Sequence, residues 1–393
     1  MDYSLLNLEI QKFITANLTV KSAYLAFQKN PFPNTDWKEI INQIVVKQKA
    51  KDKLPSWFQT ENILYPSKIS LEQTSSEKTA AYKASLVSGE RLIDLTGGFG
   101  VDDFYFAKKV KQVTHCEINE ELSKIVAHNF NQMNVANCDC IIGDSKQILE
   151  DLNQKLDWIY IDPSRRNEAK GKVFMLKDCT PNVPELLDYY FQYSSNILIK
   201  TAPILDITAG LLELKNVKEV HIVAVNNEVK ELLWIMEKNY SNDIVLKAIN
   251  LLKNTHETFE TTQSEMELPA TFSLPKKYLY EPNSAIMKSG AFNVVASKYS
   301  IHKLHPNSHL YTSDTLIDFP GRGFEIEKII PYHKTEMKTF LVEKKANVTT
   351  RNFSETVESI RKKWKIKEGG NLYGFFTTDK NDHKIVLLCS KIK

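Results

Sequence analysis

Cysteines and long apolar runs are scarce in this chain of 393 residues, and each shortage argues against a class of protein. The five cysteines are spaced neither as a disulfide framework nor as a zinc site. No apolar run approaches the roughly 18 residues that cross a membrane. Residues 1–4 show no basic region followed by an apolar core, so we expect no secretory signal. These features predict a cytoplasmic protein with no membrane span and no structural metal.

The composition is ordinary for a globular protein. Hydrophobic residues make up 42% and charged residues 25%, which excludes the disordered and fibrous classes. The length predicts two or three domains, each with its own core. The net charge of +3 is unevenly distributed, because residues 324–393 carry 15 Lys+Arg against 9 Asp+Glu. Such a basic module indicates either a nucleic-acid contact or a solvated lysine-rich surface, and the sequence leaves both open.

The segment from Arg91 to Gly100, Arg-Leu-Ile-Asp-Leu-Thr-Gly-Gly-Phe-Gly, is the most informative part of the chain. It predicts an apolar strand that ends at Asp94, then a glycine loop, then a helix that begins at Val101. Glycines let the backbone approach a ligand closely. Open α/β sheets bind ligands at the carboxyl ends of their strands. We therefore expect a nucleotide-like cofactor at this loop.

Strand and helix patterns alternate after this loop, which predicts an α/β fold with a parallel, doubly wound, Rossmann-like sheet. An antiparallel hairpin is expected over 220–236 around Asn226-Asn227, and the polar segment 255–268 is expected to be a linker. The predicted strands are 91–95, 112–117, 138–142, 157–162, 196–201 and 219–225, and helical stretches between them include 120–131, 145–152 and 183–193.

Regions of different character flank this alternation. Residues 1–72 predict helices only, one of them capped by Asp36. Thr74 to Glu77 has the spacing of a capping box that begins another helix. A helix is expected from about 283 to 298. The rest predicts a small α+β module with strands at 324–331, 347–352, 371–378 and 383–391, and with helices at 334–344 and 354–364, the second capped by Ser354.

Acidic residues stand at the ends of four successive predicted strands: Asp94, Glu117, Asp144 and Asp162. Glu117 is placed to accept both hydroxyls of a ribose. Asp144 is placed to accept from an adenine amino group. Asp94 and Asp162 would surround a cationic part of the ligand.

These acids separate two classes of cofactor. NAD carries a pyrophosphate, which Asp102 and Asp103 at the expected helix start would repel. S-adenosylmethionine carries no phosphate, and its amino group and sulfonium are both cationic. The pattern favours S-adenosylmethionine.

Taken together, the motifs resemble those of class I S-adenosylmethionine-dependent methyltransferases over residues 75–240. Segments 73–77, 280–287 and 304–311 are further similar to bacterial methyltransferases with a THUMP-like C-terminal domain. The resemblance implies that the cofactor contacts Asp94, Thr96, Gly97, Gly98, Gly100, Glu117, Ile118, Asp144 and Asp162.

The same resemblance implies four parts: a helical region (1–72), a methyltransferase domain (73–254), a ferredoxin-like domain (280–322) and a THUMP-like domain (323–393). THUMP domains are RNA-binding modules of tRNA- and rRNA-modifying enzymes, so RNA is the implied partner. Two alternatives stay open: a cofactor-binding RNA-interaction protein without catalysis, and a methyltransferase of a small molecule or a protein. The sequence does not determine the oligomeric state.

The methyl acceptor is expected at Asp162-Pro163-Ser164-Arg165-Arg166. Only half of the Asp-Pro-Pro-Tyr pattern of exocyclic-amine methyltransferases is present, because Ser164 replaces the second proline, so the acceptor atom stays open. The expected catalytic residues are Asp162, Ser164 and Arg165, and the expected substrate-binding residues are Arg166, Lys200, Arg361, Lys362 and Lys363. For Arg165 and for Arg166, a structural salt bridge to a neighbouring helix is the alternative to a role in the site.

Three other features predict structure more than chemistry. Cys179 follows the acceptor loop as a candidate nucleophile, but a buried structural cysteine is the favoured interpretation. His302, His305 and His309 have helical spacing that Pro306 interrupts, so we expect no metal there. Phe104, Tyr105 and Phe106 are expected in the core.

Overall fold

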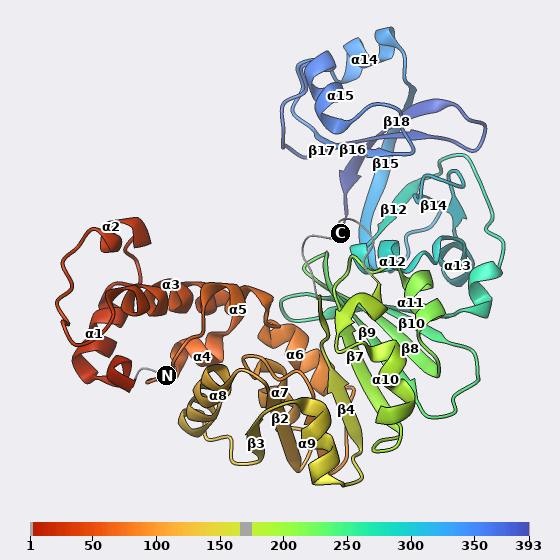
Figure 1. Cartoon of the computed structure of the whole chain (residues 1–393). Helices are drawn as coiled ribbons and strands as arrows, with labels where there is room; N and C mark the ends of the chain where they lie inside the picture. Colours follow the sequence, from red (N-terminus) through yellow and green to blue (C-terminus); the bar gives the residue numbers. More distant parts are fainter. Residues whose placement is uncertain (1–2, 166–174, 393) are drawn as a thin grey trace. The chain divides into compact units, whose positions relative to one another are not determined.

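The computed structural model describes residues 3–165 and 175–392 and contains two compact units (Figure 1). The first unit comprises Met1–Val217 with Leu233–Tyr240, and the second comprises Lys218–Leu232 with Ser241–Lys393. Within the described ranges, no helix has the length and apolar character needed to cross a membrane.

The predicted parallel sheet is present, and its strands lie within two residues of the expected bounds. β1 (Arg91–Asp94) lies between β2 (Gln112–Glu117) and β4 (Trp158–Ile161), with β3 (Cys138–Ile142) beyond β2 and β7 (Asn196–Thr201) beyond β4. All four pairings are parallel. The strand order reverses between β1 and β4, which is where open α/β sheets bind ligands.

Four further strands extend this sheet beyond β7 to a total of nine. In spatial order from β7 they are β9 (Glu228–Glu237), β8 (Val217–Val225), β10 (Val245–Leu251) and β11 (His256–Thr262).

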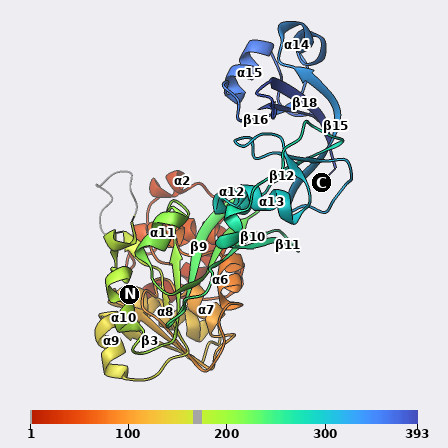
Figure 2. The ribbon, with the colours of Figure 1, turned by 90° about the vertical axis from the view of Figure 1, so that its right-hand side faces the viewer.

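Helices cover this sheet on both sides, and its central strands are buried. The helices are α6 (Glu77–Ala84), α7 (Val101–Phe106), α8 (Glu120–Gln132), α9 (Ser145–Leu152), α10 (Val183–Tyr190) and α11 (Ile207–Glu213). Figure 2 shows α6 and α7 on one side of the strands and α10 and α11 on the other. Ile93, Ile159 and Leu198 are fully buried, as continuous apolar runs in parallel strands predict.

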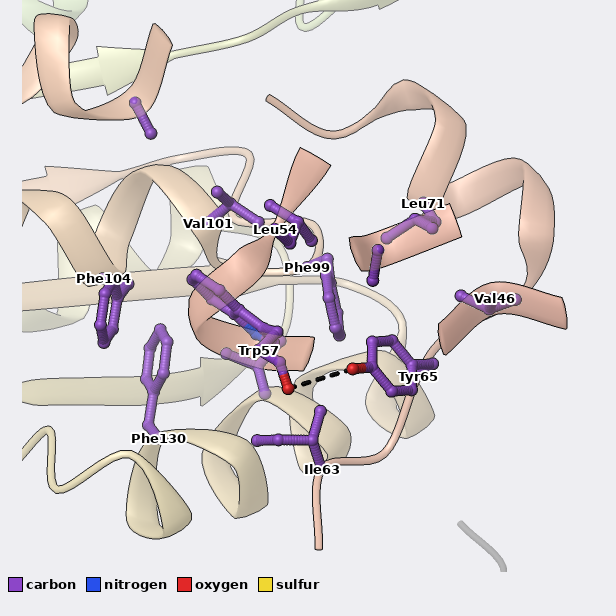
Figure 3. Packing of buried hydrophobic residues seen from close by; sticks show 13 residues of the cluster. Val46, Leu54, Trp57, Ile63, Tyr65, Leu71, Phe99, Val101, Phe104 and Phe130 are labelled. Carbon is purple, nitrogen blue, oxygen red and sulfur yellow. Dashed lines mark hydrogen bonds between the residues drawn. The ribbon is translucent and has the colours of Figure 1, made fainter. Parts of the chain in front are cut away.

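The N-terminal region is helical, as predicted, and packs against the start of the sheet domain through one apolar cluster. Trp57 is fully buried there, with its ring centroid 4.8 Å from that of Phe104 and 6.2 Å from that of Phe99 (Figure 3). Because Phe99 belongs to the glycine loop, the N-terminal helices support that loop directly. They are η1 (Tyr3–Leu6), α1 (Leu8–Ala16), α2 (Ser22–Ala26), α3 (Trp37–Lys53), α4 (Pro55–Gln59) and α5 (Lys68–Gln73).

The cap that begins α6 differs from the prediction. Ser76, and not Thr74, is the N-cap, and its side chain accepts from the main-chain N of Thr79. Glu77 accepts instead from Ser56 and from the Tyr105 hydroxyl. Glu77 thus makes a tertiary contact, which the spacing of residues 74–77 does not reveal. The Asp36 cap of α3 is confirmed.

The predicted hairpin is confirmed, and the predicted linker is wrong. β8 and β9 are neighbours in the sheet, joined by Asn226 and Asn227 with φ of 49° and 66°. The supposed linker contains β11, which pairs antiparallel with β10, and η3 (Ser264–Glu267).

The composition of β11 explains the error. Phe259 and Thr261 are its two buried side chains, and Glu260 between them is exposed. β11 is an edge strand with one buried face, so two alternating residues are enough to anchor it.

A seven-stranded sheet forms the C-terminal part of the second unit and has an apolar core on each face. In spatial order its strands are β13 (His302–Lys303), β14 (Tyr311–Ser313), β12 (Tyr278–Pro282), β15 (Gly321–Pro331), β18 (Lys384–Lys391), β17 (Leu372–Thr378) and β16 (Asn347–Arg351). Phe375 and Leu387 belong to one core, while their neighbours Phe376 and Leu388 belong to the other. β15 contributes to both, because an irregularity between Ile326 and Lys328 shifts its alternation by one residue.

Two helix predictions in this unit need correction. The helix expected from 283 to 298 is two helices, α12 (Ser284–Ser289) and α13 (Phe292–Lys298), because Gly290 between them has φ of 76°. The cap of α15 (Val357–Trp364) is Thr356 and not Ser354, whose hydroxyl accepts from Lys384 Nζ instead. The remaining helix is α14 (Lys334–Phe340).

Replacing Trp57 by Ala is expected to lower the free energy of unfolding by about 3–5 kcal/mol, because it leaves a cavity in the cluster beneath Phe99. Denaturant unfolding measures this change. Ile69→Ala, at a side chain that is 67% exposed, is the control and should change stability by less than about 0.5 kcal/mol. A Trp57→Ala loss no larger than that of the control would contradict the packing described.

Candidate active site

The glycine loop turns sharply at the end of β1 and leaves one side open. The main-chain N of Gly97 donates to Cys116 O at 2.9 Å, and that of Gly100 donates to Gly97 O at 3.0 Å. Gly98 has φ of 56°, and a Cβ added to it would meet nothing nearer than Thr96 O at 3.7 Å. The loop therefore has bare, uncrowded backbone at the switch point of the sheet.

The Glu117 side chain reaches from the end of β2 to the glycine loop. Its Oε2 accepts from the main-chain N of Gly98 at 3.0 Å, and its Oε1 accepts from the main-chain N of Asn119 at 2.7 Å. Two carboxylate oxygens have about four acceptor positions, so both retain capacity for a ligand hydroxyl.

Two apolar side chains stand exposed next to Glu117. Ile118 is 75% exposed and Ile142 is 45% exposed. Ile142 lies opposite Glu117 in the register between β2 and β3. Each of these isoleucines thus exposes apolar surface near a hydrogen-bond acceptor, which suits a planar ring attached to a sugar.

Asp144 has a local role that its position in the sequence did not suggest. Its Oδ1 accepts from the main-chain N of Lys146 and of Gln147, at 3.0 and 3.1 Å, and so caps α9. The residue is exposed at the carboxyl end of β3. The cap fixes where this carboxylate points.

Asp94 is buried below the loop and does not line its open side. It is 1% exposed, and its Oδ1 accepts from Thr96 N at 2.7 Å and from Thr96 Oγ1 at 3.0 Å. Burial raises the pKa of Asp94 well above its usual range, and the nearby Asp103 adds to the rise. Asp94 thus shapes the turn from beneath.

Asp102 and Asp103 point into the core, so the expectation that they face a ligand at the helix start is wrong. Asp102 accepts from Ser75 Oγ at 2.9 Å and from the Tyr160 hydroxyl at 2.7 Å, and it pairs with Lys83 at 3.2 Å. The Lys83 side chain is fully buried. These partners offset the cost of burying a carboxylate.

Asp103 pairs with His115 under the glycine loop. Its Oδ2 lies 2.7 Å from His115 Nδ1, and neither side chain is exposed. Burial raises the pKa of Asp103 well above its usual range, with a contribution from Asp102. A Cβ added to Gly97 would lie 2.2 Å from Nδ1 and Cε1 of His115, so the imidazole packs directly against the loop.

Sequence reasoning missed the residues of this buried layer: Ser75, Lys83, His115 and Tyr160. A histidine two residues before Glu117 on a strand is a weak hint, since both then lie on the same face. No local pattern connects a lysine on α6 with an aspartate on α7.

At the end of β4 the structure brings together three residues that the sequence predicted for the site: Thr96, Asp162 and Lys200. The main-chain N of Asp162 donates to Thr96 Oγ1 at 2.7 Å, and the Asp162 carboxylate forms an ion pair with Lys200 Nζ. Thr96 donates to Asp94 and accepts from Asp162, so its hydroxyl joins the ends of β1 and β4.

The loop after Asp162 is described only in part. β5 (Ser164–Arg165) pairs antiparallel with β6 (Cys179–Thr180), which follows η2 (Leu176–Asp178). Ser164 is exposed, and Arg166 lies outside the described residues. Cys179 is fully buried, which confirms the interpretation of a structural cysteine. Phe104 and Phe106 are likewise buried, as expected for core residues.

The basic cluster of the C-terminal module lies on α15. Arg361 forms an ion pair with Glu368 at 2.9 Å, and Lys363 forms one with Glu355 at 3.1 Å. Lys362 is exposed. Two of the three side chains thus have acidic partners within their own module.

The candidate histidines make separate contacts. His305 Nε2 lies 3.0 Å from Asp382 Oδ1, and His309 stacks on Phe292 with the ring centroids 3.6 Å apart. Across the described part of the chain, no group of His, Cys, Asp and Glu residues is arranged to hold a metal ion.

Comparisons with known proteins match this chain in two ways. Family models match residues 278–320 as a ferredoxin-like domain and residues 321–391 as a THUMP domain-like segment. A crystallised protein of Porphyromonas gingivalis W83 that is assigned as a methyltransferase is 32% identical, with 100% of each chain covered and a TM-score of 0.89.

Curated relatives match over shorter stretches. An uncharacterised RNA methyltransferase of Clostridium acetobutylicum is 26% identical over 153 residues, which is 39% of this chain and 32% of the relative. Another, of Clostridium tetani, is 30% identical over 109 residues, 27% of this chain and 23% of the relative. The chain spans a third or less of the length of these curated relatives.

Gly97→Ala is expected to lower the free energy of unfolding by about 1–3 kcal/mol, since the added methyl overlaps the buried His115 ring. Gly374→Ala is a matched control, because its Cβ would meet Phe376 at 3.5 Å, an ordinary contact distance. Thermal or denaturant unfolding of both variants measures the difference. Equal stability of the two would show that His115 does not confine the loop.

Proposed function

We propose a function for this chain on the premise of its family. The chain belongs to the methyltransferases with ferredoxin-like and THUMP-like domains at the C-terminus. We propose that it is an S-adenosylmethionine-dependent methyltransferase and that its substrate is RNA. The observation that carries the cofactor assignment is Glu117 bound to the open glycine turn at the switch point of the sheet.

The residues around the loop suit this cofactor. Glu117 would accept from the ribose hydroxyls, the exposed Ile118 and Ile142 would pack against the adenine, and Asp144 would accept from its amino group. The bare backbone at Gly98 would allow the cofactor to lie close to the turn. When bound, S-adenosylmethionine supplies a methyl group activated by its sulfonium.

Charge supports S-adenosylmethionine over a phosphorylated cofactor. Asp102 and Asp103 do not contribute to this preference, because they are buried. Glu117, Asp144 and Asp162 are the acids at the strand ends with side chains that are not buried. Glu117 and Asp144 would repel a phosphate and attract the cationic amino group or sulfonium, whereas the ion pair with Lys200 offsets part of the charge of Asp162. Asp94 contributes indirectly, by holding Thr96 in the turn.

An RNA substrate has support from two directions. The curated relatives of part of this chain are named as RNA methyltransferases, and the C-terminal segment matches a THUMP domain-like model. The excess of Lys and Arg over Asp and Glu in residues 324–393 is consistent with an attraction to phosphates. We propose that the protein works on RNA in the cytoplasm. The domain boundaries at 72, 254 and 322 stay predictions.

Glu117→Ala is expected to weaken S-adenosylmethionine binding at least about tenfold, because hydrogen bonds to a charged group contribute about 1.5–3 kcal/mol each. Titration calorimetry measures the affinity. Glu117→Gln keeps an acceptor for Gly98 N and should lose less, and Glu90→Ala, on an exposed side chain, is the control. If Glu117→Ala binds as tightly as the native protein, the cofactor is not held as we propose.

Purified protein is expected to transfer tritiated methyl groups from S-adenosylmethionine to total RNA of a strain that lacks it. RNA from the parent strain should accept far less label, because its sites are already methylated. Label in protein or small molecules, with none in RNA from the deletion strain, would reject the RNA assignment and retain the methyltransferase. Donor binding without transfer to any fraction would favour a binding protein.

A further inference from the structure

Lys200 and Asp162 form an ion pair at the carboxyl ends of the neighbouring parallel strands β7 and β4. The lysine side chain is 13% exposed and the aspartate side chain is 36% exposed, so the pair reaches the surface mainly through its carboxylate. Asp162 is also tied to the glycine turn, through its main-chain N and Thr96 Oγ1. The pair thus borders the place that we assign to the methyl donor.

A second lysine–aspartate pair in the same unit has a different setting. Lys83 and Asp102 lie in the buried layer, where Ser75 and Tyr160 also bond to the carboxylate. That pair is closed to a substrate and stabilises the fold. The pair of Lys200 and Asp162 lies at the sheet edge, where an acceptor has to approach.

An ammonium group next to the attacking atom favours one class of acceptor. A neutral amine becomes cationic as it bonds to the methyl carbon, and Asp162 offers that charge little stabilisation because its carboxylate is already paired with Lys200. A hydroxyl loses its proton during the same attack, and a nearby ammonium stabilises the negative charge that develops on its oxygen. A carboxylate beside it can accept the proton.

We infer that the acceptor is the 2′-hydroxyl oxygen of a ribose in RNA, an inference that rests on the proposed function. The oxygen attacks the methyl carbon, so that a carbon–oxygen bond forms while the carbon–sulfur bond breaks. The sulfur keeps the bonding pair and leaves as the neutral thioether of S-adenosylhomocysteine. The hydroxyl proton passes to the Asp162 carboxylate and then to water, while Lys200 stabilises the oxygen during the attack.

The resistance of the labelled RNA to alkali tests this inference. RNA from a strain without the protein is methylated with tritiated donor and then hydrolysed in alkali. A 2′-O-methyl group removes the hydroxyl that cleaves the adjacent phosphodiester, so the expected label is in alkali-stable dinucleotides. Label in mononucleotides would mean a methylated base and would overturn the inference, while leaving the proposed function in place. No label in RNA would reject both the inference and the RNA assignment.

Variants of the pair supply a second, independent measurement. Lys200→Ala is expected to slow methyl transfer at least about 100-fold, and Lys200→Arg, which keeps the charge, should recover part of the rate. Binding of S-adenosylhomocysteine, measured by calorimetry, should stay within about threefold of the native protein in both.

Lys111→Ala is the matched control, because Lys111 pairs with Glu90 on an exposed surface of the same unit. It should leave both transfer and binding unchanged. A Lys200→Ala protein that transfers methyl groups as fast as the control would overturn the role of Lys200. The alkali test uses the native protein, so it decides the acceptor even if the Lys200 variants fold poorly.

Discussion

The contact between the buried His115 ring and Gly97 is the constraint on which the rest of this site depends. The ring leaves no space for a side chain at that position, and Asp103 holds the ring through its Nδ1. With the turn fixed, Gly98 can present its main-chain N to Glu117, and Thr96 can join the ends of β1 and β4. The shape of the proposed ligand site at the edge of the sheet thus depends on the buried polar layer beneath it.

The acids near the loop fall into two groups that differ in burial. Asp94, Asp102 and Asp103 are buried and have partners that determine the shape of the turn. Glu117, Asp144 and Asp162 lie at the strand ends, and their side chains are not buried. The first group costs free energy to bury and is retained by its hydrogen bonds. The second keeps its charge available for a cationic donor, and Lys200 modifies that charge only at Asp162.

Much of the fold followed from local patterns. The apolar strands of the parallel sheet, the Asn226-Asn227 turn and the Asp36 cap were all predicted within two residues, because each depends on neighbours in sequence. β11 was missed because its burial rests on two alternating side chains and on the partner strand β10. The cap of α6 was misplaced because Glu77 bonds to Ser56 and Tyr105, which are far from it in the chain.

The sequence by itself determined the succession of the parallel strands β1, β2, β3, β4 and β7, the position of the glycine turn and the set of acids at the strand ends, since strand periodicity and glycine content are local properties. Only the tertiary structure decided which acids stay accessible at the strand ends and which are buried. It also decided that Lys83 belongs to the buried layer while Lys200 belongs to the sheet edge. The physical reason is that the surroundings of a charge depend on packing between segments, and no spacing along one strand or helix specifies them.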